Sequence, residues 1–254
     1  MPIQFNFYSG GGLDRESMSV INVQPVLPLA MGTRWNLIAR TIVPFVNAPL
    51  GNGARTEGLG GDRLQGFVTK AKTDDPTWAV GPVFSFPTAN TDAAHTGDWG
   101  LGPGVVVVKH IGAFVLRGLV TQMWPVSADG DGIQLNLLTI QPFVNYNLAD
   151  GWAISTSPII TANWAASDDD EWTIPIGVGV SKVTALGRQP FNVSIQYFGT
   201  AERPESAGSS QLRFTVSMLF PKAAAPGAST APRGDVRDGR PRRASRALRP
   251  HRRR

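Results

Sequence analysis

The sequence predicts an all-β protein, a single antiparallel up-and-down transmembrane β-barrel of about twelve strands, with short periplasmic turns and longer extracellular loops. Three observations predict this fold class. Apolar and polar residues alternate with a period of two through most of residues 18–222, short and long connections follow each other in turn, and the seven tryptophans lie at or near the ends of the alternating segments. Barrels that cross a membrane combine an even number of strands with two unlike ends.

The alternation of side chains is the first of these observations. In residues 211–220 apolar side chains occupy the even positions and polar ones most of the odd positions, and residues 171–184 and 190–200 follow a similar pattern. Successive side chains of a strand point to opposite faces, so each segment presents one apolar face and one small or polar face. No segment has a 3.6-residue period flanked by capping residues, and we therefore expect little helix.

Twelve segments carry the pattern, the first of them weakly. They span residues 3–8, 18–29, 35–46, 62–72, 78–86, 99–110, 113–126, 133–147, 152–165, 171–184, 190–200 and 211–220. The connections alternate in length, with long ones such as 47–61 and 87–98 and short ones such as 110–112. This alternation is typical of an up-and-down barrel, in which an even strand number puts both chain ends on the short-turn side.

The tryptophans indicate the two edges of an apolar band. Trp152 and Trp164 lie on one expected strand and face the same side. At ~3.3 Å per residue and a tilt of about 40°, their separation along the membrane normal is roughly 30 Å, which suits an apolar band of about 25 Å flanked by aromatic girdles. A soluble sandwich or lipocalin-like barrel, the alternative, favours tryptophan in the middle of strands. The expected interface girdle consists of Trp35, Trp78, Trp99, Trp124, Trp152, Trp164 and Trp172.

The polar face of each strand is expected to line the lumen. A charged side chain facing lipid costs about 2–4 kcal/mol at the bilayer midplane, so the mid-strand arginines should point inward. Rings of polar or charged side chains set pore selectivity, and the lumen could hold either a weakly anion-attracting constriction or a polar plug. The expected lumen-lining residues are Gln24, Arg40, Arg117, Thr121, Gln141, Asn145, Asn163, Gln196 and Arg213.

Composition excludes several kinds of site. The chain has no Cys, which rules out a disulfide framework and thiolate metal sites, and no apolar run approaches the 18 residues of a transmembrane helix. His95 and His110 fall in connections at opposite ends of the expected barrel, so they do not form a zinc site together, and His110 has no Asp or Glu nearby in sequence to orient it in a Ser–His site. The acidic runs 129–132 and 168–171 lack the ligand spacing of a calcium loop. We therefore expect no catalytic residue, no metal and no cofactor.

The chain divides into three parts by composition. Residues 1–17 hold a partial first strand and loop without a secretory signal, so a truncated N-terminus is expected, and residues 18–222 form the barrel. Residues 223–254 carry ten Arg against two Asp, a net charge of +8, while the rest of the chain is mildly acidic. This Ala/Pro/Arg-rich tail lacks aromatics and should be disordered. A solvated extension is favoured over a polyanion-binding arm, and no nucleic-acid partner is expected.

Several stretches resemble a known family. They are INVQPVLPLAMGTRWNLIARTIVPF, VGPVFSFPTANTDAAHTGDWGLGPGVVVVK, QPFVNYNLADGWAISTSPIITANW, WTIPIGVGVSKV, LGRQPFNVSIQYF and LRFTVSMLFPK. In this order they resemble the Gram-negative outer-membrane barrels known as the "MetA-pathway of phenol degradation" family, whose members are often labelled transporters or, mistakenly, neuromedin U. Family members differ in carrying an N-terminal signal and in finishing near the position of Lys222.

The resemblance implies an outer-membrane, porin-like barrel for passive passage of small solutes, with aromatic or hydrophobic compounds expected. It brings no catalytic motif. The implied partners are membrane lipid, lipopolysaccharide and the outer-membrane assembly machinery. The aromatic pattern at Phe214 and Phe220 is similar to the C-terminal signal that this machinery reads. The alternative is a sealed structural or adhesive envelope barrel without transport.

Overall fold

The computed structural model describes residues 1–11, 16–51, 53–72, 75–90, 99–126, 136–205 and 207–220. Within these ranges the chain is all-β apart from two 3-10 turns, η2 (Ala149–Gly151) and η3 (Asp168–Asp170). No helix in this part of the chain is long and apolar enough to cross a membrane. The basic tail, the acidic run 129–132 and His95 lie outside the described residues.

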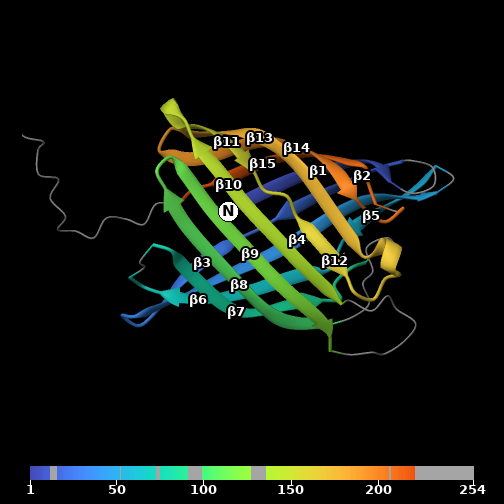
Figure 1. Cartoon of the computed structure of the whole chain (residues 1–254), viewed down its shortest axis with the longest axis horizontal. Coiled ribbons are helices and arrows are strands. Elements are labelled where there is room, and N and C mark those ends of the chain that lie inside the picture. The colour runs from blue at the N-terminus through green and yellow to red at the C-terminus, as the bar shows by residue number, and fades with distance from the viewer. Residues whose placement is uncertain are drawn as a thin grey trace, which may run out of the picture. The chain divides into compact units, whose positions relative to one another are not determined.

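The strands form one sheet that closes on itself (Figure 1). In chain order they are β1 (Pro2–Gly11), β2 (Glu16–Val23), β3 (Val26–Met31), β4 (Trp35–Gly51), β5 (Ala54–Leu59), β6 (Asp62–Lys70), β7 (Thr77–Phe86), β8 (Gly100–Ile111), β9 (Phe114–Pro125), β10 (Leu137–Asn147), β11 (Trp152–Thr156), β12 (Ile160–Asn163), β13 (Trp172–Leu186), β14 (Gln189–Glu202) and β15 (Ser210–Met218).

Each neighbouring pair in this sheet is antiparallel, and β1 closes the barrel by pairing with β15, with Phe5 opposite Phe214. Three positions in the wall are each occupied by two short strands, β2 with β3, β5 with β6, and β11 with β12. The described residues thus form a closed barrel of twelve positions, as the sequence predicts. Every one of the twelve expected segments overlaps a strand.

One expected loop is wrong. Residues 47–61 were predicted to be a long connection, but β4 continues to Gly51 and pairs with β5 in a hairpin. The outer face of this hairpin is polar: Arg55 Nε donates to Asn47 Oδ1 at 2.7 Å, and Asn47 also donates to Glu57. The outer face therefore loses its apolar stripe, although the ladder of hydrogen bonds goes on.

The two ends of the barrel differ as predicted. Tight turns join β8 to β9 at Gly112 and β13 to β14 at Gly187, where φ values of 56° and 60° favour glycine. Met1 donates from its amino group to the carbonyl oxygen of Met218 at 2.6 Å, so both ends of the sheet lie at this short-turn end. Longer connections, such as the one between β7 and β8, lie at the opposite end, which we term the loop end.

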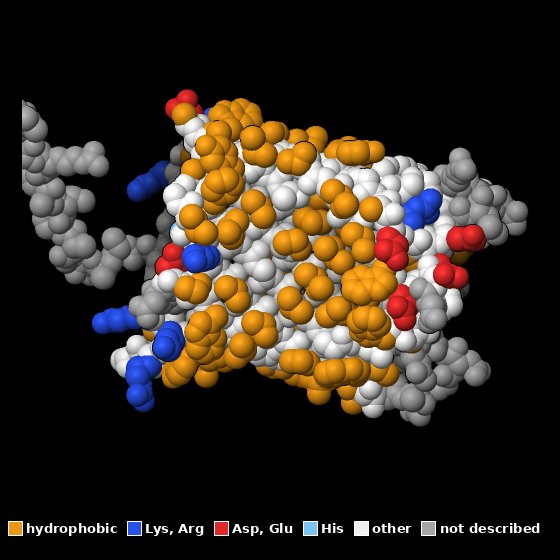
Figure 2. All heavy atoms as spheres, viewed as in Figure 1, with side chains coloured by type: hydrophobic (Ala, Val, Ile, Leu, Met, Phe, Trp, Pro, Cys, Tyr) orange, Lys and Arg blue, Asp and Glu red, His pale blue; other side chains and the backbone are white. Residues whose placement is uncertain are grey.

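The barrel is apolar outside and largely polar inside. Along β15, Leu212 and Phe214 are exposed, whereas Arg213 between them is only 1% exposed. Figure 2 shows apolar side chains spread over the middle of one face, with Lys and Arg mainly at the short-turn end and Asp and Glu mainly at the loop end. This arrangement is the reverse of a soluble barrel and is typical of a barrel surrounded by lipid.

Candidate functional site: the barrel lumen

Two cavities lie inside the barrel. The central cavity, of about 360 Å³, is lined by residues that include Gln24, Arg40, Arg63, Leu119 and Thr139. The loop-end cavity, of about 590 Å³, is lined by residues that include Glu16, Ala48, Thr161, Thr200 and Gln211. Tyr8 and Ile159 contribute to both cavities, so these two side chains stand at the boundary between them.

Ile159 reaches the lumen because the wall is interrupted between β11 and β12. Val144 lies opposite Thr156 and Ile140 lies opposite Ile160, so the two short strands keep one register against β10. Residues 157–159 leave the sheet without shifting it. Pro158 in this segment has no N–H to donate to a ladder, which lowers the cost of the break.

Arg213 holds this segment in place. Its Nη1 donates to the carbonyl oxygen of Ser157 at 2.7 Å, and its Nε donates to Asn6 Oδ1 at 3.0 Å. Its Nη2 donates to Gln211 Oε1 at 3.4 Å, and the guanidinium lies 5.0 Å from the ring centroid of Phe198. A buried charge must be hydrogen-bonded, and here neutral oxygens accept every one of these bonds.

One wall of the central cavity is polar. Arg40 donates from Nη2 to Gln24 Oε1 at 2.5 Å and from Nη1 to Gln65 Oε1 at 3.2 Å. Gln24 in turn donates to Gln4 Oε1 at 2.8 Å. Arg63 lies two positions before Gln65 on the same face of β6 and also lines the cavity. The chain of amides fixes the Arg40 guanidinium against the wall.

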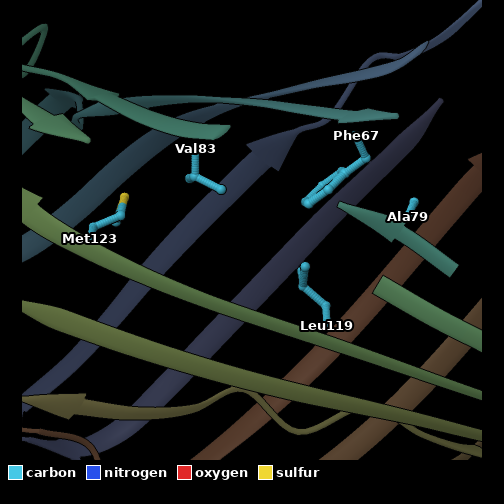
Figure 3. Packing of buried hydrophobic residues seen from close by; sticks show 5 residues of the cluster. All are labelled: Phe67, Ala79, Val83, Leu119 and Met123. Carbon is cyan, nitrogen blue, oxygen red and sulfur yellow. The ribbon is translucent and has the colours of Figure 1, made fainter. Parts of the chain in front are cut away.

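The neighbouring part of the wall is largely apolar, and Val83 lies directly across the strands from Gln65. Phe67, Ala79, Val83, Leu119 and Met123 form a buried cluster from β6, β7 and β9 (Figure 3). The lumen is therefore amphipathic, whereas the sequence predicts a polar inward face throughout. The alternation of polar and apolar residues does not reveal this apolar part of the lumen. Strands such as β8 carry consecutive apolar residues, as in VVVV at 105–108, so their sequence does not show which face points inward.

The expected lumen residues fall into three groups. Gln24, Arg40, Thr121 and Gln141 line the central cavity, where Gln24, Thr121 and Gln141 are buried. Arg213 lines the loop-end cavity, and Gln196 is buried beside the interrupted wall, where Ser157 donates to its Oε1 at 2.8 Å. The remaining three lie outside both cavities and are Asn145 and Asn163, which are half-buried, and Arg117, which is exposed.

Arg117 is exposed although it lies on the same face of β9 as buried Leu119. It is nearer the short-turn end, where β9 begins, so its side chain faces the mouth of the lumen. The residues that sequence reasoning missed are Tyr8, Arg63 and Ile159. Arg63 could have been found, because it shares the period-two alternation of Gln65. Ile159 could not, because a wall break leaves no clear periodic signal.

Six of the expected girdle tryptophans are exposed on the outside, namely Trp35, Trp78, Trp99, Trp124, Trp152 and Trp164. Trp172 is half-buried and packs edge-on against Trp164, with ring centroids 5.6 Å apart. Trp164 Nε1 donates to Gln122 Oε1 at 3.2 Å. An indole with an apolar body and one satisfied N–H suits the edge of an apolar band.

At the short-turn end the tryptophans have lysine neighbours across the strands. Trp35 lies opposite Lys70, and Trp152 lies opposite Lys182. Lys182 Nζ is 4.8 Å from the Trp152 ring centroid and donates to the Asp150 carbonyl oxygen at 2.7 Å. The pair of Trp152 and Lys182 thus places a cation beside an aromatic face at this rim of the barrel.

The expected assembly residues lie at the end of the barrel sheet. Phe214 packs against Phe5 with ring centroids 6.1 Å apart. Strand β15 ends at Met218 and not at the expected residue 220. Phe220 therefore lies beyond the strand, and its side chain is 71% exposed. Whether assembly factors read these two rings stays a prediction.

Of the groups considered for chemistry, His110 is exposed and lies 3.9 Å from Asp75. In the described ranges, no group of three or more His, Asp or Glu side chains is arranged to hold a metal ion.

Comparisons with known proteins bear on the fold. Neither a protein-family model nor a curated protein sequence matches the chain. The COG4313 outer membrane channel from Pseudomonas putida F1 superposes with a TM-score of 0.65 at 13% identity, covering 86% of this chain and 94% of that one. The chain has the fold of outer-membrane β-barrels. The NanC porin is similar too, with a TM-score of 0.52 at 10% identity over 86% of this chain and 99% of the porin.

A weaker likeness is to the Salmonella typhi outer membrane phospholipase dimer with bound calcium, with a TM-score of 0.47 at 10% identity over 87% of this chain and 90% of the other. A superposition at this level carries no argument about chemistry. The expected outer-membrane barrel is thus confirmed as a fold, and the narrower resemblance to the MetA-pathway family stays a prediction.

Proposed function

We propose that the barrel lets small solutes cross the outer membrane by passive diffusion through its lumen. The observation that supports this most is the pair of cavities, about 360 and 590 Å³, which share Tyr8 and Ile159 at their boundary. A short segment and two side chains therefore separate them. Barrels of about eight strands are filled by side chains, and this wider barrel retains space within.

The apolar wall supports solutes with an apolar body, including aromatic compounds. Val83, Leu119 and Met123 line the central cavity from this wall, together with Gln24 and Arg40. A small-molecule site commonly combines apolar surface with a few fixed polar groups. Passage then depends on the width and polarity of the lumen, without a chemical step. The proposed surroundings are membrane lipid and lipopolysaccharide, and the proposed route to them is the outer-membrane assembly machinery acting on Phe214 and Phe220.

The test is single-channel conductance of the refolded full chain in planar bilayers. We expect small conductance steps from the native chain and larger ones from Ile159→Ala, because this change widens the boundary between the cavities. Ile195→Ala is the matched control, since Ile195 is 47% exposed on the outside. The absence of steps from both the native chain and Ile159→Ala, with folding verified by heat-dependent gel migration, would contradict the proposal.

One observation favours the alternative, a sealed structural or adhesive barrel. The segment at Ser157 is fixed by two bonds from Arg213 Nη1, at 2.7 and 3.3 Å, so the boundary is held and not loose. A sealed barrel predicts that Ile159→Ala conducts no better than the native chain. The same bilayer measurement therefore separates the two functions.

A further inference from the structure

The central cavity carries positive charge without an acidic partner. Arg40 and Arg63 both line it, and no Asp or Glu is among its lining residues. In the described part of the chain the ion pair between His110 and Asp75 is the only one. Asp62 adjoins Arg63 in sequence, but it lies on the other face of β6 by the alternation of the strand. Two guanidinium groups therefore face one enclosed space.

The arginines of the lumen differ in how they are satisfied. Arg213 donates to Asn6, Ser157 and Gln211, and Arg40 donates to Gln24 and Gln65. The side chain of Arg63 forms neither a hydrogen bond nor an ion pair with any described residue, although it lines the cavity. A guanidinium presents five donors in a planar fork that matches a carboxylate. The N–H donors of the Arg63 guanidinium are therefore available to a ligand.

A second polar side chain of the cavity wall is also unpaired. The hydroxyl oxygen of Thr139 is buried without a hydrogen-bond partner, and Thr139 lines the central cavity. A guanidinium that lines a cavity without a partner has donors available for an acceptor that enters the cavity. The register places Ile42 opposite Arg63 and Arg40 opposite Gln65, which puts both arginines on neighbouring strands of one wall.

The rest of the cavity suits an apolar body. Val83, Leu119 and Met123 line another part of this cavity and belong to the buried apolar cluster. Its volume of about 360 Å³ falls within the range of roughly 300–1,000 Å³ found for small-molecule sites. An inorganic anion would use the arginines and leave this wall without a partner, whereas an uncharged apolar molecule would leave Arg63 unpaired.

We infer that the central cavity binds a small organic carboxylate, with its anionic group on Arg63 and its apolar body against Leu119 and Met123. This inference rests on the proposed function, since it names the class of solute that would pass. Arg40 supplies a second positive charge at the same wall while its own donors hold Gln24 and Gln65. Charge-assisted bidentate bonds to Arg are among the strongest that a binding site can offer an anion.

The test is calorimetric titration of the full chain in detergent with two probes of matched size, benzoate and benzyl alcohol, and with inorganic phosphate. We expect benzoate to bind about tenfold or more tightly than benzyl alcohol, because only benzoate accepts charge-assisted bonds. Arg63→Gln should lose this preference, and Arg63→Lys should recover part of it. Arg55→Gln, at the exposed outer hairpin, is the matched control and should bind benzoate as the native chain does.

Equal affinity for benzoate and benzyl alcohol would overturn the inference, as would unchanged benzoate binding in a folded Arg63→Gln variant. Phosphate binding as tight as benzoate would overturn the role of the apolar wall. Conductance of the same samples distinguishes this inference from the proposed function. A native chain that conducts but does not bind benzoate overturns only the carboxylate site. One that binds benzoate but never conducts overturns passage and supports the site.

Discussion

Arg213 Nη1 donates to the carbonyl oxygen of Ser157 at 2.7 Å and so ties the last strand of the barrel to the segment that leaves the wall between β11 and β12. The two residues lie far apart in sequence and meet across the lumen. The bond explains how a charged side chain can be 1% exposed inside a membrane barrel. It also ties the interrupted part of the wall to β15.

Arg213→Met should destabilise the barrel and loosen this segment. The change removes a charged donor from Asn6, Gln211 and the Ser157 carbonyl, and bonds to a charged group are each worth roughly 1.5–3 kcal/mol. We expect the free energy of unfolding to fall by about 2–3 kcal/mol in urea titrations of the barrel in bilayers. Arg188→Met, in an exposed turn, is the control and should change stability by less than about 0.5 kcal/mol. Equal stability of the two variants would contradict a stabilising role for the Arg213 hydrogen bonds.

Arg117→Ala should reduce any preference of the barrel for anions. Arg117 is exposed on the lumen side of β9 near the short-turn mouth, where a fixed positive charge attracts anions entering from that end. The measurement is the reversal potential across a planar bilayer with unequal KCl on its two sides, which should shift toward cation preference. Arg188→Ala removes a positive charge from a turn at the same end and is the matched control. The same reversal potential in both variants would show that Arg117 does not face the ion path.

The strands were predictable where one face of the wall meets lipid along its whole length. In β13, Ile176 and Val178 are exposed, while Gly177 and Gly179 alternate with them on the inward face. An added Cβ at Gly179 would lie 1.9 Å from the Ile195 carbonyl oxygen, so the neighbouring strand leaves no room for a side chain there. Lipid outside and crowding inside together produce a clean period of two, and the sequence alone therefore locates this strand.

The sequence did not predict features in which either the lipid-facing apolar stripe or the contrasting inward face is missing. The hairpin of β4 and β5 carries polar residues such as Asn47 and Glu57 on its outer face, so no apolar stripe marks it. On β9 the apolar Leu119 and Met123 share the inward face with Arg117 and Thr121, so the polar alternation marks only part of that face. Ile159 belongs to the lumen through a break in the wall, which has no local period, whereas Arg63 shares the alternation of Gln65 and was within reach of the sequence.

Gly104→Ala should destabilise the barrel, because the lumen is crowded there. An added Cβ at Gly104 would lie 2.9 Å from Phe67 Cε1 and 3.1 Å from Thr121 Cγ2. Overpacking of this kind typically costs about 1–3 kcal/mol. Gly118→Ala is the matched control, since nothing lies within 4 Å of a Cβ at that position. Urea titration of both variants should show a lower free energy of unfolding for Gly104→Ala alone. If Gly104→Ala is as stable as Gly118→Ala, Phe67 moves aside freely.

The pair of Trp152 and Lys182 should contribute a measurable coupling at the short-turn rim. Lys182 Nζ lies 4.8 Å from the Trp152 ring centroid, within the range of a cation–π contact, which is worth about 0.5–1 kcal/mol at an exposed site. A double-mutant cycle with Trp152→Ala and Lys182→Ala, measured by urea titration in bilayers, should return a coupling of this size. Trp35 and Lys70 are also cross-strand neighbours and supply a second cycle for comparison. A coupling at Trp152 indistinguishable from zero would show that the lysine is held by the Asp150 carbonyl alone, to which it donates at 2.7 Å.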